Sequence, residues 1–192
     1  MGTQLGIKGF TVATWYPTGP MILRRAMNYR TIQLSERTRG ETVGLLRRDG
    51  TLVSWGDNSK GQCNVPAAAT NVTAAASGVA HTLAVRRNGT VLAWGNNNYG
   101  QCNVPTAATG VVAVAGGYEH SAACRRSGTV LCWGKNTSGQ CSVPAAATNV
   151  SAVSAGCIHT LALTETGHVL AWGNNTYGQC SVPAALAPGE TA

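Results

Sequence analysis

Three histidines at a fixed spacing are the first residues that could do chemistry. His81, His120 and His159 recur with a 39-residue period, and each one stands at the start of a strand-like run. Imidazole nitrogens bind transition metals, so a ring of histidines could hold an ion. However, no acidic residue recurs beside them to orient an imidazole. Equivalent points of separate repeats also lie too far apart to share one ion unless they line a common axis. We therefore expect no metal site and no cofactor.

Cysteines recur with the same period, and the chain has seven of them. An odd number leaves at least one outside any intramolecular disulfide, and no C-x-x-C pair indicates zinc. Equivalent cysteines of different repeats should be farther apart than the ~7 Å that a disulfide spans. Cys124, Cys132 and Cys157 replace Val, Ala or Leu of sister repeats, which favours ordinary packing. The recurring cysteines are Cys63, Cys102, Cys141 and Cys180.

Carboxylates, which most catalytic sites need, are scarce in this chain. The sequence has seven Asp and Glu residues, and within the repeats only Asp57, Glu119 and Glu165 fall near loop tips. No serine elbow, phosphate-cradling glycine loop or metal triad is present. The sequence therefore predicts a protein that is not an enzyme.

A repeat without insertions organises these residues. Trp, Gly and Pro recur with the 39-residue period, together with the histidines and cysteines. A fixed period of about 40 residues is typical of solenoids and propellers. The tryptophans are predicted to fill the gaps between neighbouring sheets, because large rings supply much buried area. The tryptophans are Trp55, Trp94, Trp133 and Trp172, and the prolines are Pro66, Pro105, Pro144 and Pro183.

One repeat unit, residues 81–119, predicts four short strands. Residues 81–86 and 90–94 are β-rich runs joined by a turn at Asn88-Gly89, which is a strong hairpin signal. Residues 102–104 predict a brief third strand that stops at a proline, and residues 111–115 predict a fourth of Val and Ala. Four strands per repeat match a propeller blade, with the small-residue strand innermost. The fold class predicted is all-β, with about four antiparallel four-stranded blades.

The string from His159 to Pro183, H-T-L-A-L followed by G-H-V-L-A-W-G-N-N-T-Y-G-Q-C-S-V-P, resembles the repeat of the regulator-of-chromosome-condensation family. The compact form of the repeats is similar to bacterial propellers that inhibit β-lactamases. The resemblance covers residues 42–184 and implies a blade fold and a protein-binding role. Such propellers usually have seven blades, so about four would leave the ring incomplete. The wedge insertion that serves nucleotide exchange in the family has no counterpart here.

The segments outside the repeats are residues 1–41 and the tail, residues 185–192. Residues 1–41 carry six basic and two acidic residues. The stretches 11–16 and 31–34 could add outer strands to the first blade, and an Arg-rich organellar targeting segment is the alternative. No signal-peptide core or apolar window of ~20 residues occurs, so an intracellular, cytoplasmic location is the expectation, with organellar import left open.

Alternation along the strands separates two rims of the blades. One rim, called the tyrosine rim, is expected to carry exposed tyrosines among asparagines, a composition that protein-binding surfaces favour. The Asn-x-x-Gly-Gln loops themselves are expected to be mainly structural, because amide side chains satisfy loop backbone groups. The candidate protein-binding residues of the tyrosine rim are Tyr99, Tyr118, Tyr177, Asn97 and Asn98.

The opposite rim, called the arginine rim, carries doubled arginines at three hairpin tips. Their positive field could attract nucleic acid or another polyanion, and the net charge of +7 permits this. No aromatic residue lies beside them, which disfavours a single-strand reader. The leading prediction is a protein-interaction module, in a homo-oligomer or larger complex. Oligomerisation, residues 1–41 or another subunit would cover the open blades. The candidate anion-binding residues are Arg47, Arg48, Arg86, Arg87, Arg125 and Arg126.

Overall fold

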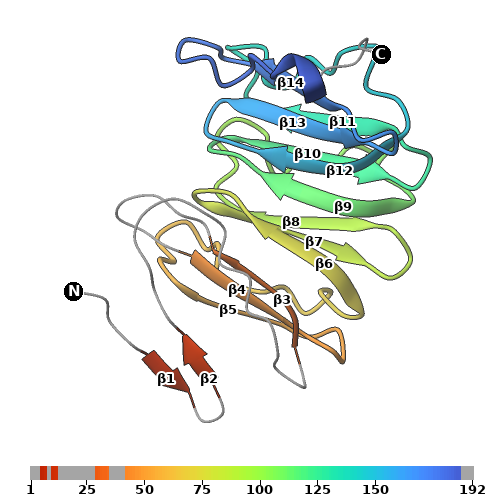
Figure 1. Ribbon diagram of the computed structural model, residues 1–192. Helices are drawn as coiled ribbons and strands as arrows, with labels where there is room; N and C mark the ends of the chain where they lie inside the picture. Colours follow the sequence, from red (N-terminus) through yellow and green to blue (C-terminus); the bar gives the residue numbers. More distant parts are fainter. Residues whose placement is uncertain (1–4, 8–9, 13–28, 35–41, 187–192) are drawn as a thin grey trace.

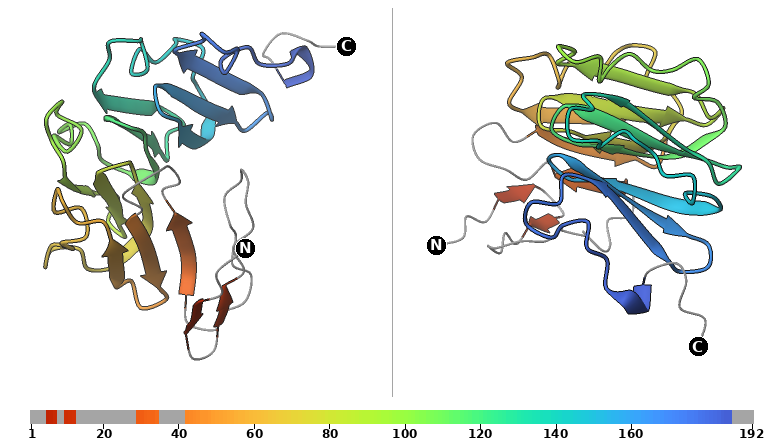
Figure 2. Two further views of the ribbon diagram at one scale, coloured as in Figure 1. Left: turned by 90° about the vertical axis from the view of Figure 1, so that its left-hand side faces the viewer. Right: turned by 90° about the horizontal axis from the view of Figure 1, so that it is seen from above.

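The computed structural model describes residues 5–7, 10–12, 29–34 and 42–186 (Figure 1). Within these residues the regular structure consists of strands and one short 3-10 turn, so the predicted all-β class is confirmed. A two-stranded sheet, β1 (Leu5–Ile7) and β2 (Phe10–Val12), stands apart from four larger sheets. The larger sheets follow one another along a curved row (Figures 1 and 2).

Each of the four sheets has three antiparallel strands, and the same pairing recurs in each. In the second sheet, for example, His81 pairs with Gly95, and in the third His120 pairs with Gly134. The strands are β3 (Tyr29–Leu34), β4 (Thr42–Arg47) and β5 (Leu52–Gly56); β6 (Val72–Ser77), β7 (His81–Arg86) and β8 (Val91–Gly95); β9 (Val111–Gly116), β10 (His120–Arg125) and β11 (Val130–Gly134); β12 (Val150–Ala155), β13 (His159–Thr164) and β14 (Val169–Gly173).

The predicted third strand of each unit is not a strand. Residues 102–104 form a turn in which Asn103 N–H donates to the Gly100 carbonyl and Val104 N–H donates to the Cys102 carbonyl. These local bonds occupy the backbone groups that a sheet ladder would need, and Pro105 follows immediately. The blades of the described chain therefore have three hydrogen-bonded strands, where the sequence predicted four.

The division between repeats also falls elsewhere than predicted. The strand of Val and Ala, β9, pairs with β10, so it opens the third sheet and does not close the second. Three residues join β9 to β10, whereas fifteen separate β8 from β9. A short connection favours antiparallel pairing with the strand that follows. The first strands of successive sheets, β6, β9 and β12, contact one another, which agrees with the predicted inner position of these strands.

The first sheet takes its first strand from the segment before the repeats. β3 pairs with β4, with Tyr29 opposite Arg47, as Val72 lies opposite Arg86 in the second sheet. Residues 31–34 are thus in the first sheet as predicted, although at the position of the inner strand. The other predicted stretch, residues 11–16, is described only at residues 11–12, which pair with β1 in the separate sheet. Residues 13–16 lie outside the described residues.

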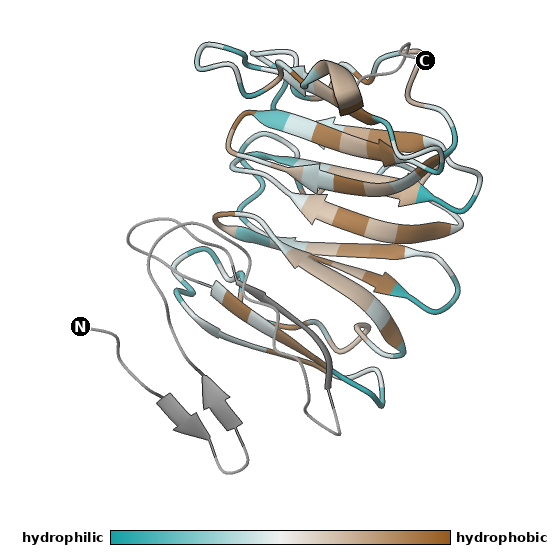
Figure 3. Cartoon of the chain, in the orientation of Figure 1, coloured by the Kyte–Doolittle hydropathy of each residue, from teal (hydrophilic) through white to brown (hydrophobic). Residues whose placement is uncertain are grey.

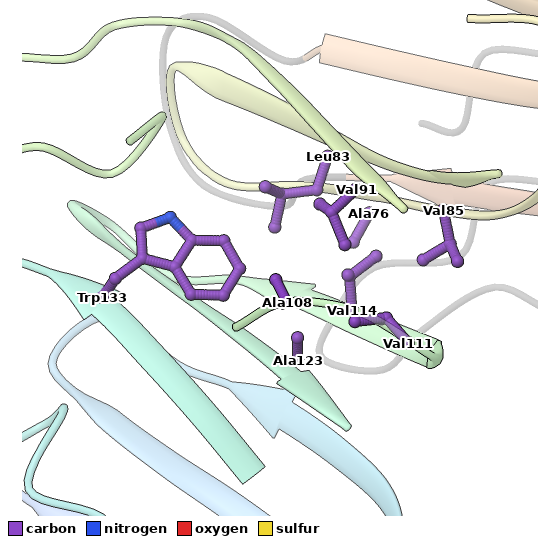
Figure 4. Packing of buried hydrophobic residues seen from close by; sticks show 9 residues of the cluster. All are labelled: Ala76, Leu83, Val85, Val91, Ala108, Val111, Val114, Ala123 and Trp133. Carbon is purple, nitrogen blue, oxygen red and sulfur yellow. The ribbon is translucent and has the colours of Figure 1, made fainter. Parts of the chain in front are cut away.

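The hydrophobic core lies between neighbouring sheets, and hydrophobic residues occur along the strands of these sheets (Figure 3). Leu83 and Val85 of β7 pack against Val114 of β9 and Trp133 of β11 (Figure 4). Leu83 is fully buried, and Ala108 joins the same cluster from the loop that connects the two sheets. Similar clusters occupy the junctions before and after it. Each core therefore needs two sheets, which is the packing logic of a repeat protein.

Candidate interaction surfaces

The polar loop after each third strand is held together by its own side chains. In the second sheet, Asn97 Oδ1 accepts a hydrogen bond of 2.9 Å from Cys102 N–H, and Asn97 Nδ2 donates to Asn103 Oδ1 at 2.8 Å. Gln101 Oε1 accepts from Tyr99 N–H at 2.9 Å. The side-chain amide of Asn97 is therefore engaged within its loop, as predicted for structural asparagines. Asn98 is exposed at the tip of the loop.

The same loop connects neighbouring sheets through one backbone carbonyl. The Gln101 carbonyl accepts hydrogen bonds of 2.8 Å from Ser121 Oγ and from Trp133 Nε1, both of the third sheet. The Gln62 carbonyl accepts in the same way from Thr82 and Trp94 of the second sheet at 2.9 Å. Trp94 and Trp133 thus fill the junctions with the preceding sheets as predicted, and the carbonyl satisfies the indole N–H of each.

The recurring histidines belong to this junction. His81 Nε2 lies 3.0 Å from Ser121 Oγ, and His120 Nε2 lies 3.0 Å from Thr160 Oγ1 of the following sheet. Because each hydroxyl donates its proton to a glutamine carbonyl, the imidazole Nε2–H must be the donor to it. Burial, followed by the charge of the next histidine along the row, lowers the pKa of both His81 and His120 to about 4.

No group of three or more His, Cys, Asp or Glu side chains in the described part of the chain could hold a metal ion. The described residues also include no helix long and apolar enough to cross a membrane. The candidate residues named from the sequence lie on two surfaces, the tyrosine rim and the arginine rim.

On the tyrosine rim, an ion pair within the third sheet reaches a tyrosine of the second sheet. Lys135 Nζ lies 2.6 Å from Glu119 Oε2, and the same ammonium lies 4.3 Å from the centroid of the Tyr99 ring. Tyr118 precedes Glu119, and Tyr99 and Tyr118 are 47% and 45% exposed. Lys135 of this ion pair thus holds the Tyr99 ring by a cation–π contact, and Tyr118 is the chain neighbour of its partner Glu119.

Tyr177 lies at the corresponding position of the last described sheet and is 92% exposed. No described residue stacks on its ring as Lys135 does on Tyr99. Lys135 and Glu119 were not predicted from the sequence as residues of the binding surface, because neither residue recurs at the 39-residue spacing. Their opposite charges, at two predicted loop positions on the same rim, were the available signal.

On the arginine rim, three of the six predicted arginines surround one shallow pocket of about 570 Å³. Arg86, Arg87 and Arg126 line it together with Asn88. The hairpin that carries Arg86 and Arg87 has the predicted turn, in which Asn88 Oδ1 accepts a hydrogen bond of 3.1 Å from Thr90 N–H. Arg125 points elsewhere, since its Nε donates to the Thr109 carbonyl at 3.1 Å. Arg47 and Arg48 do not line the pocket.

The repeated three-stranded sheets with junctions of Trp, His and Gln define a protein built of propeller-type blades. Residues 72–101, 111–140 and 150–179 match the model of the regulator of chromosome condensation (RCC1) repeat. These three segments are similar to the RCC1 repeat, as the sequence string indicated. The matched segments begin at β6, β9 and β12, which agrees with the division into sheets described above.

Solved structures show the same fold at low sequence identity. Prp20p of Saccharomyces cerevisiae, studied for binding to Gsp1p and histones, is 18% identical with a TM-score of 0.61, and the match covers 79% of this chain and 47% of Prp20p. Human WBSCR16 is 21% identical with a TM-score of 0.56, covering 69% of this chain and 44% of that protein. At this identity the likeness establishes the fold alone.

The yeast protein bound to Kap60 matches as well, with 19% identity, a TM-score of 0.59, and coverage of 80% of this chain and 46% of that one. The chain thus spans about half the length of these solved relatives. No curated protein sequence is similar enough to the chain to count as a relative.

Proposed function

We propose that this chain is a protein-interaction module without catalytic activity, and that its partner docks on the tyrosine rim. The observation that carries the proposal is the cluster of Tyr99, Tyr118, Lys135 and Glu119. The exposed Tyr99 ring is held by Lys135 of the ion pair before any partner arrives, so little conformational freedom of this ring is lost on docking. Such rigid amphipathic rings are common centres of binding energy.

The partner can be identified by pull-down from the source organism, and a titration then tests the rim. The variant Tyr99→Ala/Tyr118→Ala should bind the identified partner at least about tenfold more weakly, because truncation of a central ring costs about 1–2 kcal/mol or more. The matched control is Arg86→Ser/Arg87→Ser on the opposite rim, which should bind normally. Equal affinity of the tyrosine variant and the wild type would refute the proposal. The compact repeats also resemble β-lactamase-inhibitory propellers, so an enzyme is one class of partner to test.

A second function is favoured by the pocket of the arginine rim. Arg86, Arg87 and Arg126 converge on it from two neighbouring sheets, and guanidinium groups bind phosphate or carboxylate through paired hydrogen bonds. We infer that an acidic protein or polyanion docks there, more weakly than the partner of the tyrosine rim. The variant Arg86→Ser/Arg87→Ser/Arg125→Ser/Arg126→Ser should fold and elute early from heparin. Unchanged retention would show that these arginines only solubilise the surface.

We also infer that another blade covers the last described sheet, in a homo-oligomer or a larger complex. Leu163 of β13 is 40% exposed, whereas the equivalent Val85 and Cys124 are 1% and 0% exposed beneath the following sheet. A sheet face of this kind favours packing against a further sheet, because each junction core is formed by two neighbouring sheets.

A further inference from the structure

Cys132 and Cys141 are the feature of the third sheet that distinguishes it from the others. Cys132 lies in β11 at the outer edge of the sheet, and Cys141 lies in the loop that follows. Their sulfur atoms are 2.6 Å apart. A disulfide bond is ~2.05 Å long, so the side chains already point at each other within about 0.6 Å of bonding distance. Both residues are half-buried.

The sister repeats show what the loop cysteine does without a partner. The positions equivalent to Cys132 are occupied by Ser54, Ala93 and Ala171. There the loop thiol donates to the carbonyl of the residue six positions earlier, at 3.2 Å for Cys102 and Asn96. In the third repeat the equivalent separation, between Cys141 Sγ and the Lys135 carbonyl, is 3.6 Å. The thiol of Cys141 is thus farther from the carbonyl and faces the second sulfur.

We propose that Cys132 and Cys141 are a site of reversible disulfide formation that closes the loop between them. This pair was not predicted from the sequence, because the distances considered were those between equivalent cysteines of different repeats and not those within one repeat. The loop contains Lys135, the cation that pairs with Glu119 and stacks on Tyr99. Oxidation would therefore restrict the backbone on both sides of Lys135, the cation of the ion pair on the tyrosine rim, whatever partner that rim binds.

The two thiols have different roles in the reaction. A hydrogen bond from Cys132 lowers the pKa of the Cys141 thiol and raises the pKa of Cys132, whereas burial raises the pKa of Cys102 to about 11. The Cys141 thiolate attacks a small disulfide such as oxidised glutathione, forming a mixed disulfide and releasing one glutathione thiolate. Cys132 gives its proton to that thiolate and attacks the Cys141 sulfur, releasing a second glutathione. Two protein thiols are oxidised and one glutathione disulfide is reduced.

Peptide mapping of the full chain tests the proposal directly. The reduced, folded protein is incubated with oxidised glutathione, its remaining thiols are alkylated, and it is then denatured and digested with trypsin. Cleavage after Arg126 and Lys135 releases residues 127–135, whose one cysteine is Cys132. We expect this peptide to be joined by a disulfide to residues 136–192, and to be freed by dithiothreitol. Recovery of residues 127–135 with alkylated Cys132 would overturn the proposal.

Substitutions assign the bond to the two sulfurs. Cys132→Ala gives the third repeat the residue of its sisters, so it should fold and show no linkage at its loop. A Cys157→Ser/Cys180→Ser variant should keep the linkage, because its remaining cysteine in residues 136–192 is Cys141. Loss of the linkage in that variant would contradict the assignment. Ala93→Cys should create a second linkage, to Cys102, since it places the same pair in the second repeat.

The midpoint of thermal unfolding provides an independent measurement. A disulfide that closes a short loop restricts the unfolded chain, so oxidised wild type should unfold at a higher temperature than reduced wild type. Cys132→Ala should unfold at the same temperature with and without oxidised glutathione. Equal midpoints for oxidised and reduced wild type would count against a bond in the folded protein.

Discussion

Trp133 Nε1 donates a hydrogen bond of 2.8 Å to the carbonyl oxygen of Gln101, so the large ring of one sheet is tied to a loop of the sheet before it. Trp133 is also part of the apolar cluster that contains Leu83 and Val85 of the preceding sheet (Figure 4). One residue therefore supplies both the packing and the polar contact of a junction, which makes it a sensitive point for stability.

Trp133→Ala should lower the free energy of unfolding by about 3–5 kcal/mol, because it leaves a large cavity and removes one of the two hydrogen bonds to the Gln101 carbonyl. Trp55→Ala is the matched control, since this tryptophan of the first sheet is 43% exposed and should cost much less. Urea titrations followed by circular dichroism measure both changes. Similar losses for the two variants would contradict a special role of the buried junction.

The glycine three residues before each recurring histidine leaves space for the imidazole ring of that histidine. A Cβ atom at Gly117 would overlap the His120 ring and come within 2.8 Å of the Gly156 carbonyl oxygen. Gly117→Ala should therefore destabilise the protein by about 1–3 kcal/mol through overpacking. Gly44→Ala is the control, because the nearest atom to its Cβ would be Ser77 Oγ at 3.9 Å. Thermal unfolding of both variants provides the comparison, and an unaffected Gly117→Ala would show that the ring can move aside.

The buried histidines make stability depend on pH. The folded protein keeps the pKa of His81 and His120 at about 4, below the 6.5 of an exposed histidine. Between these values the unfolded chain binds more protons, so stability is complete above pH 6.5 and falls as the pH drops toward 4. Each pKa unit corresponds to about 1.4 kcal/mol, so each buried histidine contributes a few kcal/mol over this window.

Urea titrations at pH 7.5, 6 and 5 measure this dependence. We expect the free energy of unfolding to fall steadily over that series in the wild type. A His81→Gln/His120→Gln variant should be less stable at pH 7.5 and should show a shallower dependence between pH 6.5 and 5. A wild type whose stability is flat over the same range would indicate that the imidazoles gain partners on protonation.

The periodic part of the fold could be predicted from the sequence, because residues that pack in the same way recur in every 39-residue copy. Strand β7 was predicted with its observed bounds, and the buried role of Trp133 followed from its recurrence. Residues 102–104 were wrongly predicted as a strand. Their short pattern also suits a turn, and only the hydrogen bonds that Asn103 N–H and Cys102 N–H donate to the Gly100 carbonyl and to Asn97 Oδ1 decide between the two.

The features that occur once in the chain could not be predicted from the repeat. Strand β3 was expected as an outer strand and lies at the inner position, and seven residues separate it from β4, whereas three residues separate β6 from β7. Lys135 and Glu119 both stand at positions that differ between copies, and so does Cys132, whose partner Cys141 recurs in every copy. Periodicity identifies what the copies share, whereas a site that belongs to one sheet needs the three-dimensional arrangement.

The uncovered face of the last described sheet carries the remaining prediction. Leu161 and Leu163 of β13 occupy the positions of Leu83 and Val85, which are buried beneath the following sheet. Exposed apolar side chains on a flat sheet face favour contact with a second copy or another subunit.

Leu163→Asp should shift the protein toward the monomer, because a carboxylate on this face would lose its hydration in the contact. Val112→Asp is the matched control: Val112 is 41% exposed, as Leu163 is 40% exposed, but it lies outside the junction clusters. Light scattering after size-exclusion chromatography, over a range of micromolar concentrations, should give a larger mass for wild type and Val112→Asp than for Leu163→Asp. A wild type that is monomeric throughout, in the absence of any other subunit, would rule out a second copy and leave a different subunit as the cover of this face.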